Sequence, residues 1–154
     1  MRKIAPPLTV FLLLHFFTSN AQSDSIPVAR TLTTLLKICK HVDFSDPKTT
    51  SVGTFYKAAP YIVYRGEGDK ARRWKDFANY NNAEEKKGVD EVCYKINQTA
   101  NQDSSYQFIK YFTEKESEGT WHVIIVAYTK KGKAKEAAFA FLKIRGRYAL
   151  GDID

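Results

Sequence analysis

The stretch TWHVIIVAYTKKGKAKEAAFAFLKIRGRYALGDI, residues 120–153, contains three extended segments separated by short turns. The extended segments are rich in β-branched and aromatic side chains, which favour strands. Each turn carries a glycine among basic residues, as expected for a tight hairpin. We therefore predict strands at residues 120–129, 134–144 and 148–153, with turns at 130–133 and 145–147.

Working back from this stretch, residues 104–113 form one more aromatic-rich strand, followed by a turn at 114–119. Before Asn101 the apolar residues change to helical spacing. Ser25 and Pro27 are typical of a helix start, and the following apolar positions predict a helix that reaches Val42. The remaining expected elements are a loop at 43–50, a short helix at 55–59, a strand at 61–64, a helical turn or two within 70–82, and a long helix at 84–100.

Helices that precede an antiparallel meander predict an α+β fold. The chain has 154 residues and a formal charge of +7, and we expect residues 22–154 to form one domain. Residues 1–21 read as a signal peptide, with a basic start, an apolar run over 8–17 and small residues before Gln22. Cleavage there would remove Arg2 and Lys3 and predicts an exported protein, periplasmic or secreted, without a membrane span.

The strand at residues 120–129 is apolar on both faces instead of alternating. An antiparallel strand with one face in water should alternate, so both faces need a cover. With the helices on one face, the other face would be a large apolar patch, which usually marks an interface. We therefore predict a homodimer, with an open face formed by His122, Ile124, Val126 and Tyr128.

This layout resembles the NTF2-like superfamily, which includes SnoaL-type and ketosteroid-isomerase-like proteins. The resemblance rests on the opening helix, the passage FYKAAPYIVYRG at 55–66, the helix at 84–100, and the closing segments FAFLKIRGRY at 139–148 and GDID at 151–154. It implies a curved sheet wrapped on helices into a cone around an apolar pocket, often in a dimer. The aromatic residues expected at such a pocket are Tyr61, Tyr106, Phe108, Trp121, Phe139 and Phe141.

The isomerase branch of this family needs a carboxylate base and a tyrosine as oxyanion donor. The opening helix has no tyrosine between Pro27 and Val42, and Asp43 is a weak candidate for the base because Asp is common in turns. The GEGDKA segment at 66–71 lacks the context of a dinucleotide site, so we expect no cofactor. The two cysteines, Cys39 and Cys93, form either two buried thiols or one helix-to-helix disulfide, and their spacings predict no metal site.

Two clusters of basic residues could bind anionic groups, although most such clusters are solvated surface. One surrounds Trp74 and the other occupies the turn at 130–133; their members are Lys70, Arg72, Arg73 and Lys75, and Lys130, Lys131, Lys133 and Lys135. Asn97 begins a glycosylation sequon, relevant only in a eukaryotic host. The leading hypothesis is an exported, non-catalytic domain that binds an apolar small molecule or a protein partner in its cone. The alternatives are a small isomerase or hydrolase that uses Asp43, and a basic module that adheres to anionic surface polymers; nucleic acid is not an expected partner.

Overall fold

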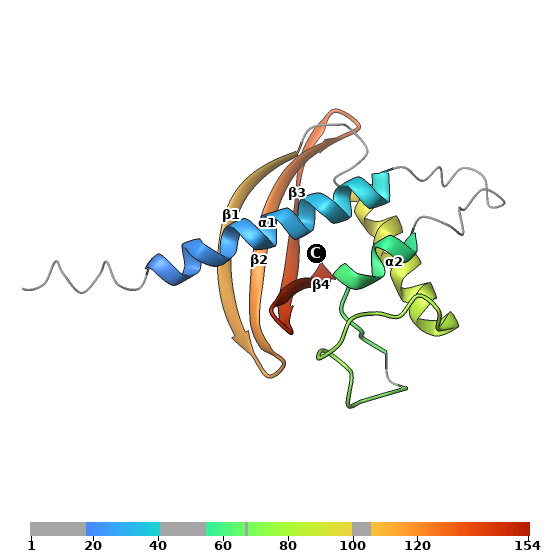
Figure 1. The fold of residues 1–154 in the computed structure, drawn as a ribbon. Coiled ribbons are helices and arrows are strands. Elements are labelled where there is room, and N and C mark those ends of the chain that lie inside the picture. Colours follow the sequence, from blue (N-terminus) through green and yellow to red (C-terminus); the bar gives the residue numbers. More distant parts are fainter. Residues whose placement is uncertain (1–17, 41–54, 67, 100–105) are drawn as a thin grey trace, which may run out of the picture.

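The chain folds into helices packed against a curved, four-stranded antiparallel sheet, giving a cone-like α+β arrangement (Figure 1). The computed structural model describes residues 18–40, 55–66, 68–99 and 106–154. Its elements are α1 (Thr18–Lys40), the 3₁₀ turns η1 (Phe55–Lys57) and η2 (Ala59–Tyr61), α2 (Ala83–Thr99), β1 (Tyr106–Glu116), β2 (Gly119–Lys130), β3 (Lys133–Ile144) and β4 (Arg147–Ile153). The α+β class and the four strands predicted from the sequence are confirmed.

The sheet is a simple meander in the order β1-β2-β3-β4. Lys131 and Gly132 (φ 52° and 72°) link β2 to β3, and Arg145 and Gly146 (φ 49° and 79°) link β3 to β4. Two consecutive residues with positive φ form the hairpin turn whose twist matches that of the strands. The basic–glycine pairs in the two predicted turns therefore lie at the positions where the chain reverses.

Helix α1 lies across the concave face of the sheet, and the two pack through a continuous apolar core (Figure 1). On the helix, Val28, Leu32 and Leu35 are completely buried, and on β3 so are Phe139 and Phe141. Each such side chain contributes roughly 1.5–3 kcal/mol relative to exposure. The prediction that the helix begins near Ser25 was wrong, because α1 begins at Thr18 and contains Pro27. Upstream of this proline the helix is held to the sheet by an ion pair between Asp24 and Lys143.

The segment between the helices is less regular than predicted. The expected helix at 55–59 is a pair of 3₁₀ turns that includes Pro60, and the expected strand at 61–64 is reduced to two bridges, a parallel one from Ile62 to Leu150 and an antiparallel one from Val63 to Phe77. Instead of a helix within 70–82 there are turns, and Trp74 adopts a left-handed conformation with φ 63°. Backbone hydrogen bonds between residues 62–64 and 74–78, together with the ion pairs of Arg72, hold this segment.

The predicted assignment of the two faces of β2 was wrong. His122, Ile124 and Val126 are 5%, 2% and 0% exposed, and Ile124 and Val126 belong to the core beneath α1. Tyr128, also expected on the open face, is half-buried and packs against the same core. Both faces are apolar, so the sequence pattern could not tell which of them the helix covers. The outer face carries the other set, which includes Val123, Ile125 and Ala127.

A second, smaller core covers one end of the outer face. Trp74 and Phe77 pack there against Val63 and a group on β3 and β4 that comprises Leu142, Ile144 and Ala149. The segment at 70–82 thus folds over part of the sheet. Within the described ranges, no helix is both long enough and apolar enough to cross a membrane.

Candidate functional site

The structure does not gather the six predicted pocket aromatics into one site. Phe139 and Phe141 are completely buried in the core, and Tyr61 packs against its edge. Trp121 lies on the opposite face of the sheet from Phe139, as the register of β2 and β3 requires. Tyr106 and Phe108 contact each other on β1, with ring centroids 5.8 Å apart. The proposed base, Asp43, lies outside the described residues.

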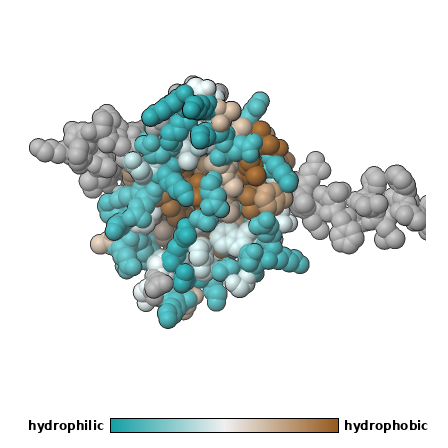
Figure 2. All heavy atoms as spheres, turned by 180° about the vertical axis from the view of Figure 1, so that it is seen from behind, coloured by the Kyte–Doolittle hydropathy of each residue, from teal (hydrophilic) through white to brown (hydrophobic). Residues whose placement is uncertain are grey.

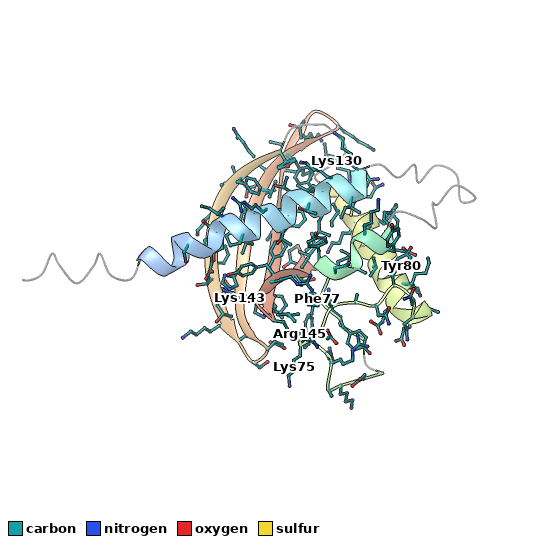
Figure 3. All side chains as sticks on the ribbon, viewed as in Figure 1. Lys75, Phe77, Tyr80, Lys130, Lys143 and Arg145 are labelled. Carbon is teal, nitrogen blue, oxygen red and sulfur yellow. The ribbon has the colours of Figure 1, made fainter. Side chains whose placement is uncertain are left out.

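A polar cluster that the sequence analysis missed lies between α1 and the sheet. The Tyr111 hydroxyl and His122 Nδ1 form a hydrogen bond of 2.7 Å. The His122 ring meets the Tyr148 ring edge-on, with centroids 4.9 Å apart. Lys143 lies 3.5 Å from the Asp24 carboxylate on α1, and Figure 3 shows Lys143 beside this helix, at the end of the sheet opposite Lys130. The only sequence signals for this cluster were His122 and Lys143 among apolar strand residues.

The pKa shifts in this cluster indicate fixed protonation states. Burial lowers the pKa of His122, so its ring is neutral at neutral pH. Burial raises the pKa of Tyr148, and the nearby Asp24 carboxylate acts in the same direction. The Tyr148 hydroxyl and the Lys143 ammonium lower the pKa of Asp24. A general base that works near neutral pH needs a raised pKa, so Asp24 is suited to holding α1 on the sheet.

A cleft of about 390 Å³ opens beside this cluster, lined by Asp24, Trp74, Glu118, Gly119, Thr120, His122, Leu142 and Lys143. Two of its polar groups, Asp24 and Lys143, already pair with each other. This pairing leaves them less available to a ligand.

An apolar patch occurs where α1 meets the first strand. Ile26, Phe108 and Ile109 are 59%, 46% and 54% exposed, and they are three of the five large apolar side chains exposed in the described structure. They surround a shallow groove of about 290 Å³ between α1 and β1. Its other lining residues are Ser25, Ala29, Lys110, Tyr111 and Ile124. An irregularity in the pairing of β1 at Ile109 interrupts the ladder beside this groove.

The solvent-facing side of α1 continues the patch with basic residues. Ile26, Arg30, Lys37 and Lys40 are all exposed, and at 3.6 residues per turn they lie within about 80° of one another around the helix. Asp24 is the only acidic residue of α1, and it is engaged with Lys143 on the sheet. We call this stripe, together with Phe108, Ile109 and Lys110, the α1–β1 surface.

The two basic clusters predicted from the sequence differ in their surroundings. Arg72 is held by Asp76 at 3.1 Å and by Glu85 at 2.9 Å, and both carboxylates raise its pKa. Arg73 lies over the Trp74 ring at 5.6 Å. In the other cluster, Lys130 donates a hydrogen bond of 2.6 Å to the Gln98 carbonyl at the end of α2. Its other members, Lys131, Lys133 and Lys135, are exposed at the β2–β3 hairpin.

On the outer face, Trp74 and Trp121 meet edge-on at 5.5 Å, beside a cleft of about 380 Å³. The cleft floor includes Phe112, Val123, Ala138 and Ala140, and its rim includes Glu114, Glu116, Asp152 and Asp154. Within the described residues, no group of three or more His, Cys, Asp or Glu side chains is placed to hold a metal ion.

Comparisons of the chain with protein-family models, with curated proteins and with solved structures give no match. The geometry of its own residues is therefore the basis for any functional proposal.

Proposed function

We propose that this protein is an exported, non-catalytic binding domain that docks on an anionic phospholipid surface through the α1–β1 surface. The observation that carries the proposal is the continuity of exposed Ile26, Phe108 and Ile109 with the basic stripe of α1. Without Arg2 and Lys3 the exported chain keeps 22 basic against 17 acidic residues, and this formal charge of +5 acts in the same direction.

A lipid surface uses both halves of the α1–β1 surface. Each Lys or Arg close to an anionic membrane contributes about 1 kcal/mol of attraction, and exposed apolar side chains enter the boundary between headgroups and acyl chains. A charged polysaccharide would engage the basic residues but would leave Ile26 and Ile109 in water. We therefore favour a phospholipid surface over other anionic polymers.

Two observations weigh against the other functions considered from the sequence. The cone interior is filled by the chain's own side chains, among them Phe139 and Phe141, which disfavours an apolar ligand there. Among the described residues, the carboxyl groups of Asp24 and Asp76 have lowered pKa values, which makes these two groups poor acid–base catalysts because such a role calls for a raised pKa; Asp43 lies outside the described residues.

Vesicle sedimentation tests the proposal. The exported protein is mixed with vesicles of phosphatidylcholine alone or with 30% phosphatidylglycerol. We expect binding only to the anionic vesicles, weakened by salt, and reduced roughly tenfold or more by the double substitutions Ile26→Ser/Ile109→Ser and Arg30→Gln/Lys37→Gln. The matched controls are Tyr94→Ser and Lys87→Gln, which alter exposed residues of α2.

Three outcomes would contradict the proposal. They are equal binding to neutral vesicles, an equal loss in the control variants, and binding to heparin without binding to vesicles. The last result would favour an anionic polysaccharide as the partner.

We also propose that the protein forms a two-fold dimer through the outer face of the sheet. Phe112, Ile125, Ala138 and Ala140 are only partly buried on this face, beside the buried Val123. Seen from the side opposite to that of Figure 1, hydrophobic residues gather in part of a largely hydrophilic surface (Figure 2). An apolar patch of this kind is typical of a self-complementary interface, and the substitution that tests it is described in the Discussion.

A further inference from the structure

The two cysteines of the chain come together although they belong to different helices. Cys39 lies in the last turn of α1 and Cys93 in the middle of α2. Both side chains are completely buried in the same apolar core. Both thiols therefore belong to one core, which is compatible with two free thiols and with one disulfide between the helices.

The two cysteines lie on helices that pack against each other. Each is a free thiol in this structure, and both belong to the core that joins α1 to α2. Leu35, Leu36, Val89 and Ile96 belong to the same cluster. Buried thiols on helices packed in one core can bond after a small approach and rotation, whereas cysteines on diverging elements would need the backbone to move.

We propose that Cys39 and Cys93 form a disulfide that ties α1 to α2 in the exported protein. The reaction is thiol–disulfide exchange with a small-molecule disulfide such as oxidised glutathione. One cysteine attacks the disulfide as a thiolate, which releases one glutathione thiol and leaves a mixed disulfide. The second cysteine displaces the other glutathione, so that two protein thiols become one disulfide and one glutathione disulfide becomes two thiols.

Burial determines when this bond forms. The hydrogen bond from Cys39 and the apolar surroundings raise the pKa of Cys93, so its reactive thiolate is scarce in the folded protein. Small oxidants also have no direct access to a completely buried thiol. Exchange therefore takes place in the unfolded or partly folded chain, and the fold then protects whichever redox state it encloses.

The experiment compares two refolding conditions for the exported protein. It is unfolded in guanidinium with reductant and refolded with either oxidised and reduced glutathione or dithiothreitol. After glutathione refolding we expect chains that are not linked to one another by disulfides, with no titratable thiol in denaturant, a mass per chain lower by two hydrogen atoms, and a melting temperature higher by about 10 °C or more. The reduced refolded protein should show two thiols in denaturant and should react slowly with oxidised glutathione while folded.

Two variants serve as controls. The double variant Cys39→Ala/Cys93→Ala should melt at the same temperature under both conditions, and Cys93→Ala should retain one thiol or carry a glutathione. If the double variant does not fold, the thiol count and mass of the unaltered protein decide the question alone. Two free thiols after glutathione refolding, or a disulfide found only between molecules, would overturn the proposal. This inference does not depend on lipid binding.

Discussion

The two faces of β2 carry side chains of similar apolarity, but they are covered in different ways. The inner face is closed by α1, through buried side chains such as Leu32 and Leu35 and, near the start of the helix, through the ion pair of Asp24 with Lys143. The outer face is covered at one end, by Trp74 and Phe77 from a segment without regular secondary structure. A regular helix satisfies its own backbone, so apolar packing is sufficient to hold it.

An irregular segment needs polar partners as well. Arg72 bonds to Asp76, to Glu85 and to the Phe77 carbonyl, and Asp76 also pairs with Arg145 at 3.3 Å. Glu85 additionally accepts a hydrogen bond from the Asn79 amide. The comparison shows that the outer cover depends on an extended charged network, whereas the inner cover depends mainly on apolar packing, to which the Asp24–Lys143 ion pair adds one polar contact.

The largest effect is expected when glutamate replaces one of two adjacent residues of β2 that lie on opposite faces of the sheet. Ile124→Glu places a carboxylate in the core beneath α1 and should cost at least about 4 kcal/mol, enough to unfold much of the protein. Ile125→Glu, on the outer face, should fold and yield a monomer where the unaltered protein is a dimer. Circular dichroism and light scattering at micromolar concentration check both results. An unaltered protein that is monomeric would refute the dimer, and a folded Ile124→Glu variant would refute the assignment of the inner face.

The next largest effect tests the charged network of Arg72 that holds the segment covering the outer face. Arg72→Met leaves the Glu85 side chain, which is 6% exposed, without its cation, and should destabilise the protein by about 2–3 kcal/mol in guanidinium titrations. The matched control Lys87→Met breaks an ion pair whose side chains are 79% and 69% exposed, and it should change stability by less than about 0.5 kcal/mol. Equal effects of the two substitutions would mean that the outer cover does not depend on the Arg72 network.

A smaller effect is expected where a glycine permits the two tryptophans to pack. A Cβ atom at Gly151 would lie 2.5 Å from the Trp121 ring and 3.5 Å from that of Trp74. Gly151→Ala should therefore cost about 1–2 kcal/mol through overpacking. Trp121→Leu makes room, so a double-mutant cycle should show that the alanine costs less in that background. Additive effects would indicate that the contact with Trp121 is not the cause.

The smallest expected effect is a pH dependence of the free energy of unfolding, caused by His122 on the inner face. Burial lowers the pKa of His122 below its ordinary value of 6.5, so the unfolded chain takes up this proton before the folded one. Stability should therefore be constant above this value and decline as the pH falls below it, before Asp24 and Asp76 lose their contributions below pH 3.8. His122→Gln should flatten the decline between about pH 6.5 and 5 in urea titrations. An unchanged slope would assign it to another group.

The sequence was informative about local structure and much less so about how the elements meet. Period-two patterns and basic–glycine turns located the four strands to within a few residues, because hairpins form between neighbours in the chain. Even-numbered and odd-numbered residues of β2 lie on opposite faces of the sheet, and both sets are apolar. The sequence therefore could not show whether His122, Ile124 and Val126 face α1 or the outside. The cluster of Asp24, His122 and Lys143 joins α1, β2 and β3, so no local pattern could reveal it.

The irregular segment was predicted least well for the same reason. Residues 61–64 have strand-like composition, but Ile62 and Val63 form isolated bridges, to Leu150 and Phe77, instead of a strand. The basic stripe of α1 was visible as a set of outward positions. Its importance became evident only when Phe108 and Ile109 were placed beside Ile26.

The bridge between Ile62 and Leu150 has a consequence for the order in which the chain folds. The three hairpins join neighbouring strands and close short loops, so they form early. The bridge joins residues 88 positions apart, since the Val63 amide donates to the Leu150 carbonyl near the carboxyl end of the chain. During synthesis, Trp74 and Phe77 therefore have no complete surface to cover until β4 leaves the ribosome. A nascent chain stalled before residue 147 should remain sensitive to protease within residues 62–78.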